Sequence, residues 1–362
     1  MDQPYGYLVA VVIVASATVF ALVPFRGRAL AMMSFRCSLI VYELPVLAAC
    51  WLAVVTVWTA LDDGLGNPVG VVGAALASLT CLVLAVIARR GLRTGPAVDA
   101  AMSGAFGPRW RSVLPAGRPS ALAGLVLPLR VRRRGVVRVA DLSYGPAGKR
   151  NRLDVLHRRD LPKGGPVLVH FHGGGYFSGR KNREARQLLH RLAAHGWVCL
   201  SANYRLRPSA GFAEHVADAE AAVAWAREHA PGYGADPSAL FLAGGSAGAH
   251  LAASIALGGV PVRGVVCLYG YYGRYYETGA GSSPLDRLRA DAPPFLVAHG
   301  DRDSLVPVEA AREFAGRLRA ASGGPVVFAE LPGGQHAFDL FASPRSCAVA
   351  EAVEAFALLV RT

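Results

Sequence analysis

The chain has 362 residues, a formal net charge of +13 and a mean hydropathy of +0.33. This length suits one large domain with an accessory region, or two ordinary domains. The six cysteines show neither CxxC nor metal-ligand spacing, so the sequence predicts no metal site and no disulfide framework. Residues 1–90 are almost wholly apolar, whereas the rest alternates charged and apolar segments as a soluble α/β domain does.

Three uncharged stretches near the N-terminus have about the length that crosses a bilayer core. They are Tyr7–Phe25, Leu44–Leu61 and Gly66–Ala88. We expect three transmembrane helices over residues 1–93, because buried helices of a soluble core rarely reach this length without a charge. The start Met1-Asp2-Gln3 lacks the positive charge of a signal peptide, which favours a retained first helix.

The charges between these stretches predict an orientation. Basic residues lie after the first and third stretches and acidic residues after the second: Arg26, Arg28 and Arg36, then Asp62 and Asp63, then Arg89, Arg90 and Arg93. By the positive-inside rule the N-terminus is external, and everything after residue 89 is cytoplasmic. The sequence thus predicts a multi-pass protein of the cell membrane with a cytoplasmic catalytic domain.

A basic linker is expected over residues 94–135. Thr94 to Leu129 is rich in Gly, Pro, Ala and Arg without a sustained period, which indicates a linker with one or two short helices. Between residues 89 and 138, eleven arginines face the single acid Asp99, a net charge of +10. Such charge directly after an apolar span favours contact with the anionic inner leaflet. A nucleic-acid partner is disfavoured, because no aromatic-plus-basic pattern accompanies the arginines.

Residues 136–362 alternate short β-prone runs with helix-length segments, which predicts a largely parallel sheet covered on both faces. Strands are expected at Val136–Leu142, Leu153–Leu156, Val167–Phe171, Val198–Asn203, Leu240–Ala243, Val265–Tyr269, Phe295–Ala298 and Val326–Glu330. Helices are expected at Asn182–Ala194, Ala213–His229, Ala247–Leu257, Val308–Ala321 and Cys347–Val360. Ligands of such sheets bind at the carboxyl ends of the strands, so the loops there should carry the chemistry.

A G-x-S-x-G motif, Gly244 to Gly248, follows one of these strands and precedes a helix. A sharp, strained turn there would project the Ser246 hydroxyl out of the sheet, and glycine lets the neighbouring backbone pass closely. The glycine run after His172, at the exit of an earlier strand, can turn backbone N–H groups towards a developing oxyanion. Ala247, following the nucleophile, can supply another N–H. The plainer alternative for the run is a flexible turn.

An acid and a base are expected after later strands. Asp301 and Asp303 both follow Phe295–Ala298, and either also suits turn formation. His336 lies on a glycine-rich loop after the last strand, which gives the chain order Ser, Asp, His. In this arrangement His336 takes the proton of Ser246 as the serine attacks a carbonyl, and neither a metal nor an organic cofactor is needed.

Together these motifs resemble the carboxylesterases of the hormone-sensitive-lipase-like and related microbial esterase branches of the α/β-hydrolases. The matching segments are Asn151 to Val155, His172 to Gly175, Asn203 to Leu206, Gly244 to Gly248, His299 to Pro307 and Gly334 to His336. The resemblance covers residues 137–362 and implies an α/β-hydrolase fold with a mostly parallel, eight-stranded sheet. It assigns the acid to Asp303 and the oxyanion donors to Gly174, Gly175 and Ala247. The sequence departs from the branch at Gly245, where its commonest form has Asp.

We therefore expect a membrane-anchored serine carboxylesterase, lipase-like in character, that cleaves uncharged carboxylic esters of small molecules or lipids. A tyrosine-rich segment after Val265 is expected to wall an apolar acyl pocket, with Tyr176, Tyr271 and Tyr275 as substrate-binding candidates. The equal alternative is a packed loop whose rings cover the sheet edge. An amidase or peptidase with the same triad, and a non-catalytic binding protein on this fold, are the alternative functions.

Overall fold

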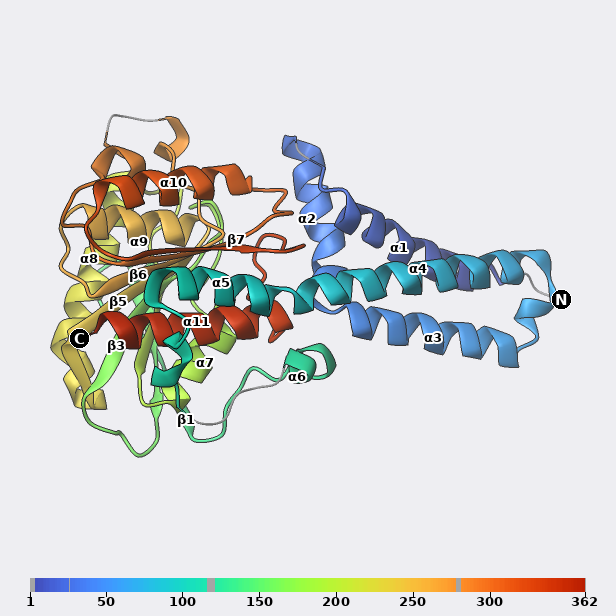
Figure 1. The fold of residues 1–362 in the computed structure, drawn as a ribbon, viewed down its shortest axis with the longest axis horizontal. Helices are drawn as coiled ribbons and strands as arrows, with labels where there is room; N and C mark the ends of the chain where they lie inside the picture. The colour runs from blue at the N-terminus through green and yellow to red at the C-terminus, as the bar shows by residue number, and fades with distance from the viewer. Residues whose placement is uncertain (1–3, 26, 116–120, 278–280, 362) are drawn as a thin grey trace.

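The computed structural model describes residues 4–25, 27–115, 121–277 and 281–361. An α/β domain carries a long bundle of N-terminal helices that projects from one side of it (Figure 1). Arg26 and Arg118, which contribute to the charge patterns above, lie outside the described residues.

An eight-stranded sheet forms the centre of the domain, in the order β1-β2-β4-β3-β5-β6-β7-β8. The strands are β1 (Val136–Ser143), β2 (Arg152–Arg158), β3 (Gly165–Phe171), β4 (Val198–Ala202), β5 (Ala235–Gly245), β6 (Gly264–Leu268), β7 (Phe295–Gly300) and β8 (Val326–Leu331). β2 pairs antiparallel with both β1 and β4, and every other pairing is parallel. The predicted mostly parallel, eight-stranded sheet is confirmed.

Helices cover both faces of the sheet. One face carries α8 (Phe212–His229), α9 (Ala247–Leu257) and α10 (Val308–Ala321), and the other carries α5 (Thr94–Phe106), α7 (Arg186–Ala194) and α11 (Pro344–Val360) (Figure 1). Within β3, Val167 and Val169 join the first core and Leu168 the second. Successive strand side chains point to opposite faces, so a continuous apolar strand serves both cores.

Shorter elements connect these layers. They are α6 (Ala121–Val126) and the 3-10 turns η1 (Gly64–Gly66), η2 (Trp110–Val113), η3 (Gly148–Asn151), η4 (Ala230–Tyr233), η5 (Tyr275–Glu277) and η6 (Pro284–Arg287). The turn η1 lies at the far end of the helical bundle, close to Pro4 at the start of the first helix.

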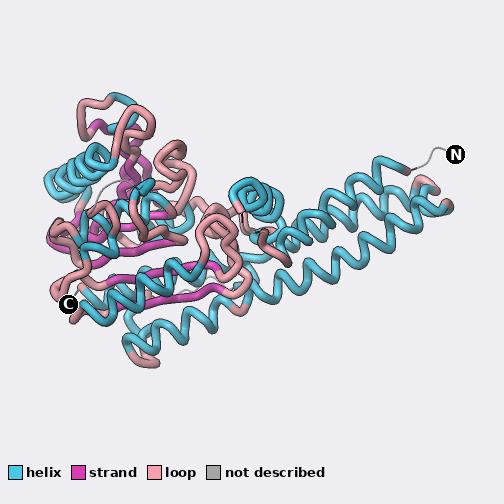
Figure 2. Tube along the Cα trace, turned by 90° about the horizontal axis from the view of Figure 1, so that it is seen from above, coloured by secondary structure: helices cyan, strands magenta, loops and turns pink. Residues whose placement is uncertain are grey.

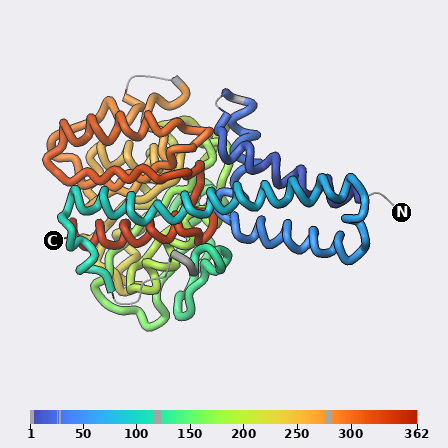
Figure 3. The backbone as a smooth tube through the Cα atoms, turned by 45° about the vertical axis from the view of Figure 1, so that its right-hand side comes forward, coloured from blue at the N-terminus to red at the C-terminus, as the bar shows by residue number. Residues whose placement is uncertain are grey.

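The projecting bundle consists of α1 (Tyr5–Leu22), α3 (Pro45–Leu61) and α4 (Pro68–Leu92), as Figures 2 and 3 show from two further sides. Tyr7, Val11 and Leu52 are buried between these helices, while apolar residues such as Ile13 and Leu82 are exposed on the outside. An apolar surface of this extent on a bundle of long helices is typical of contact with a membrane.

By length and composition, two helices of the described chain can cross a membrane: α1, and the rod that α4 and α5 form together over Pro68–Phe106. Helix α3 joins α2 (Arg28–Glu43) at a bend of 85°, and gives a third span if this bent pair counts as one. The N-terminal helices are therefore apolar enough for two to three spans.

Two elements differ from the expectations. The segment between the first two apolar stretches is helix α2, which lies across the base of the bundle beside the α/β domain (Figure 1). The expected linker begins with helix α5, which packs on β8 and α11 and buries Val98 and Met102 in the core. Packing of this one face stabilises a helix whose glycine and proline disfavour it when considered alone.

A buried ion pair joins α2 to the start of α11. Nη1 of Arg345 donates to the carbonyl oxygen of Tyr42 at 2.8 Å and lies 3.3 Å from Oε1 of Glu43. The side chains of Arg345 and Glu43 are at most 1% exposed. Since each charge is costly to bury without its partner, the pair specifies how the bundle sits on the α/β domain.

We expect Arg345→Met to lower the stability of the full chain by about 3–5 kcal/mol, because it leaves the Glu43 carboxyl buried without a counter-charge. Adding Glu43→Gln to this variant should restore part of the loss. Thermal unfolding of the detergent-solubilised protein measures both effects. A double variant no more stable than Arg345→Met would show that the unpaired carboxyl is not the cause.

Candidate active site

Ser246 lies on the turn between β5 and α9 with backbone angles φ 54° and ψ −118°, which a non-glycine residue adopts only under constraint. The flanking glycines allow this turn. A Cβ on Gly244 would lie 2.2 Å from the carbonyl carbon of Gly248, and one on Gly248 would lie 2.0 Å from the carbonyl oxygen of Phe171. The crossing backbones thus leave no room for side chains, and the turn presents Ser246 at the carboxyl end of β5.

His336, in the loop after β8, contacts Asp303, in the loop after β7. The distance from His336 Nδ1 to Asp303 Oδ2 is 2.7 Å. The other carboxylate oxygen of Asp303 accepts hydrogen bonds from the N–H groups of Leu305 and Val306, each at 2.8 Å. Every oxygen of the buried carboxylate therefore has a partner, which fixes the imidazole ring that it contacts.

The pKa values of this pair move apart. Burial alone would raise the pKa of Asp303, but the charge of His336 and the hydrogen bonds from His299 and His336 hold it well below its usual range. Burial likewise would lower the pKa of His336, but the charge and hydrogen bond of Asp303 outweigh burial and raise it above 6.5. Asp303 is thus ionised, and His336 is made a stronger base.

Asp301, the competing aspartate, has a different environment. Its Oδ1 accepts a hydrogen bond from the N–H of Gly333 at 2.7 Å and so supports the turn that leads to His336. The geometry thus separates the two aspartates into one that contacts the imidazole and one that holds the preceding loop.

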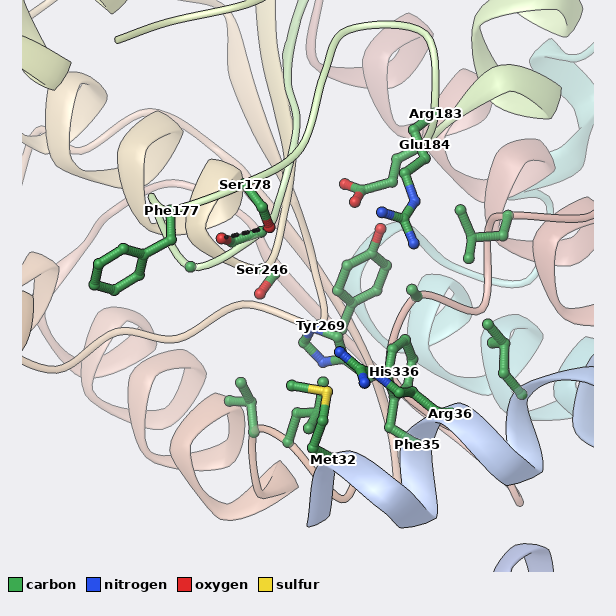
Figure 4. A pocket seen from close by; sticks show the side chains of 17 residues that line it. Met32, Phe35, Arg36, Phe177, Ser178, Arg183, Glu184, Ser246, Tyr269 and His336 are labelled. Atoms are coloured by element: carbon green, nitrogen blue, oxygen red, sulfur yellow. Dashed lines mark hydrogen bonds between the residues drawn. The ribbon is translucent and has the colours of Figure 1, made fainter. Parts of the chain in front are cut away.

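A cavity of about 630 Å³ brings the remaining candidates together. Ser246, His336, Gly174 and Gly175 line it, and Ala247 follows Ser246 as the first residue of α9. Figure 4 shows Ser246, Tyr269 and His336 around its centre. The other lining residues are Met32, Phe35, Arg36, Leu39, Phe177, Ser178, Arg183, Glu184, Leu305, Val306, Ala337 and Leu340.

The three tyrosines expected in the substrate pocket do not line this cavity. Tyr176 is buried, with its hydroxyl 2.8 Å from His250 Nδ1 and its ring stacked on His215 at 4.7 Å. Tyr275 packs edge-on against Tyr176, with ring centroids 5.0 Å apart. The hydroxyl of Tyr271 donates to the Arg274 carbonyl. Tyr176 and Tyr275 thus belong to a buried cluster outside the cavity lining, and Tyr271 is partly exposed.

Sequence reasoning missed the contribution of helix α2. Met32, Phe35, Arg36 and Leu39 line the cavity, and their spacing of i, i+3, i+4 and i+7 places them on one helical face. The sequence contains that spacing, but the arginines of the segment indicate only a basic connection between two apolar stretches. Phe35 packs edge-on against the His336 ring, with centroids 5.9 Å apart.

Tyr269 and Glu184 are further lining residues without a sequence signal. The Tyr269 ring contacts His336 with centroids 4.8 Å apart, and its hydroxyl donates to Asp339 Oδ1 at 2.6 Å. Glu184 Oε2 accepts from the N–H of Gly173 at 2.6 Å, and burial raises the pKa of Glu184 to about 7. Both residues therefore support loops that reach the cavity.

Tyr269 explains the departure at position 245. A Cβ on Gly245 would lie 2.4 Å from the Tyr269 hydroxyl oxygen, and that ring is fully buried. An aspartate before Ser246 would therefore collide with Tyr269. The small residue at position 245 thus goes together with the large ring of Tyr269.

The described residues hold no cluster of three or more His, Cys, Asp or Glu side chains arranged to bind a metal ion. The fold and this arrangement of Ser, His and Asp define an α/β-hydrolase.

Comparison with known proteins agrees with this class. A family model described as BD-FAE matches residues 153–261. The chain is 34% identical to the probable carboxylic ester hydrolase LipM of Mycobacterium tuberculosis, over 97% of this chain and 92% of that protein. It is 35% identical to the esterase LipQ of the same organism, over 73% and 74% of the two chains.

Among solved structures, the butyrate-bound form of a thermophilic esterase from Thermogutta terrifontis is 26% identical, with a TM-score of 0.51. The match covers 61% of this chain and 91% of that one. The chain belongs to the α/β-hydrolase esterases of the hormone-sensitive-lipase-like branch, and it is a serine ester hydrolase.

Proposed function

We propose that the protein is a membrane-anchored carboxylesterase that uses Ser246, His336 and Asp303 as a triad and passes through an acyl-enzyme. The observation that carries this proposal is one cavity lined by Ser246 and His336, with the imidazole held by a buried, ionised Asp303. His336 takes the proton of Ser246 as the serine oxygen attacks the ester carbonyl, and returns it to the leaving alcohol. Water then repeats the sequence on the acyl-enzyme.

The N–H groups of Gly174, Gly175 and Ala247 are the oxyanion donors in this mechanism. Within the described residues, none of the three donates to a protein acceptor. Gly174 and Gly175 have φ of 109° and 60°, a backbone region that favours glycine. Donors already in place and without a protein partner are what a developing oxyanion requires.

The substrate class follows from the lining of the cavity. Met32, Leu305, Val306 and Leu340 give it an apolar part, which supports an uncharged acyl group, beside the charged Arg36, Arg183 and Glu184. A short acyl product, butyrate, is bound in the Thermogutta terrifontis esterase. We leave Tyr176, Tyr271 and Tyr275 out of the proposed substrate site because they lie outside this lining.

We expect Ser246→Ala and His336→Ala each to lower kcat by about four orders of magnitude or more, because triad members act as a unit. Turnover of p-nitrophenyl butyrate measures the loss, and unchanged thermal unfolding shows that the variants fold. The wild-type protein should be labelled by a fluorophosphonate probe, and Ser246→Ala should not. Labelling that persists in Ser246→Ala would overturn the assignment of the nucleophile.

The two aspartates make a matched comparison. Asp303→Asn should lower kcat by about a thousandfold or more, because the imidazole loses the partner that fixes its tautomer and stabilises its charge. Asp301→Asn should cost far less. The neutral imidazole is the active base, so its raised pKa moves the acidic limb of the kcat/KM profile to higher pH than an unperturbed histidine would give. In Asp303→Asn the residual activity should show this limb at lower pH, because the charge that raises the pKa is gone.

The proposed division is a transmembrane region over residues 1–93, a basic linker over 94–135 and a catalytic domain over 136–362, with helix α5 of the linker packed on the catalytic domain. Arg130, Arg132, Arg133 and Arg134 are exposed in the linker and support contact with anionic lipid. Arg111 of the linker instead forms an ion pair with Glu351, and Arg138 forms one with Asp154. Both acidic residues belong to the catalytic domain.

The proposed orientation places the catalytic domain in the cytoplasm. The start of α1 and the turn η1 lie together at the end of the bundle remote from the catalytic domain (Figure 1). This arrangement supports placing that end of the bundle and the catalytic domain on opposite sides of a bilayer. A reporter fused at the C-terminus is expected to behave as cytoplasmic, and one inserted between Asp62 and Asn67 as external. An external C-terminal reporter would reverse the orientation.

A further inference from the structure

Helix α2 has two different faces. Met32, Phe35, Arg36 and Leu39 line the cavity that holds Ser246 and His336. Leu30, Met33 and Ile40 lie outside that lining and are exposed to 49%, 46% and 57%. The helix thus carries apolar side chains both along the cavity, where Met32 is itself 39% exposed, and on a more exposed outer side.

The catalytic loops hold this helix in place. The hydroxyl of Ser304 donates to the carbonyl oxygen of Ala31 at 3.1 Å, and Nε2 of Gln335 donates to Ser38 Oγ at 3.4 Å. Ser304 and Gln335 are the neighbours of Asp303 and His336 in the chain. A part of the anchor is therefore fixed against the reacting groups, so a side chain on its inner face lies beside the substrate.

The position of α2 also relates the cavity to the bilayer. The helix meets α3 at a bend of 85°, so it crosses the base of the bundle (Figure 1). Figure 4 shows Met32, Phe35 and Arg36 along one wall of the cavity, on the same helix. The cavity therefore lies directly beside the apolar N-terminal helices.

We propose that the inner face of α2 is the binding wall for the hydrocarbon chain of an amphiphilic lipid ester, and that it sets the chain length the enzyme accepts. This inference rests on the proposed esterase function at Ser246. The cavity volume of about 630 Å³ accommodates a chain of this kind beside the ester group. In this role the anchor selects the substrate as well as holding the enzyme at the membrane.

Neighbouring residues of α2 provide matched variants. Leu39→Trp places an indole in the cavity, whereas Ile40→Trp places the same ring on the exposed outer face, where tryptophan suits a membrane interface. Met32→Trp and Met33→Trp form a second pair if Leu39→Trp fails to fold. For each full-length variant in detergent micelles, kcat/KM is measured with p-nitrophenyl decanoate and p-nitrophenyl acetate.

The decanoate-to-acetate ratio should fall by about tenfold or more in Leu39→Trp and Met32→Trp, since steric differences of a methylene or more change kcat/KM by at least about that factor. Ile40→Trp and Met33→Trp should keep the wild-type ratio. The role of α2 would be overturned if the decanoate-to-acetate ratio stayed unchanged in both inner-face variants. It would also be overturned if the ratio fell equally in the inner-face and outer-face variants. Absence of fluorophosphonate labelling and acetate turnover in the wild-type protein would instead overturn the proposed function.

Discussion

The side-chain amide of Gln335 joins three segments on which the active site depends. Its oxygen accepts hydrogen bonds from the N–H groups of Ser304, at 2.7 Å, and His336, at 2.9 Å, while its nitrogen donates to Ser38 of α2. The Asp303 loop, the His336 loop and helix α2 thus share one fully buried side chain. Because a buried amide is costly to leave unsatisfied, each of these segments helps to hold the other two in place.

A second constraint acts at Ser246. Its strained backbone is held where α9 starts so close to β5 and to the end of β3 that Gly244 and Gly248 have no room for side chains. Tyr269 fills the space beside Gly245 and reaches from there to the His336 ring. Close backbone packing and one large ring therefore define the surroundings of Ser246 in this chain.

Buried contacts join the N-terminal helices to the α/β domain. Helix α5 continues α4 and buries Met102 in the same core as α11, while Arg345 at the start of α11 reaches Glu43 at the end of α2. Helix α2 also contributes Met32, Phe35 and Leu39 to the lining of the cavity. The apolar N-terminal region and the α/β domain are therefore packed as one structure around the candidate site.

The sequence by itself determined the sheet and the helices that alternate with its strands, because β-prone runs and turn glycines are local patterns set by backbone sterics. The chain order of Ser, Asp and His can also be read directly from the sequence. It also indicated the apolar helical bundle, because long stretches without charged residues can be recognised directly in the sequence. The residue pattern left Asp301 and Asp303 open and only the family resemblance favoured Asp303, whereas the tertiary structure shows the contact of Asp303 with His336 directly. It also removed Tyr176 and Tyr275 from the cavity and placed α2 there. Side-chain partners of this kind come from segments far apart in the chain, and no local pattern records them.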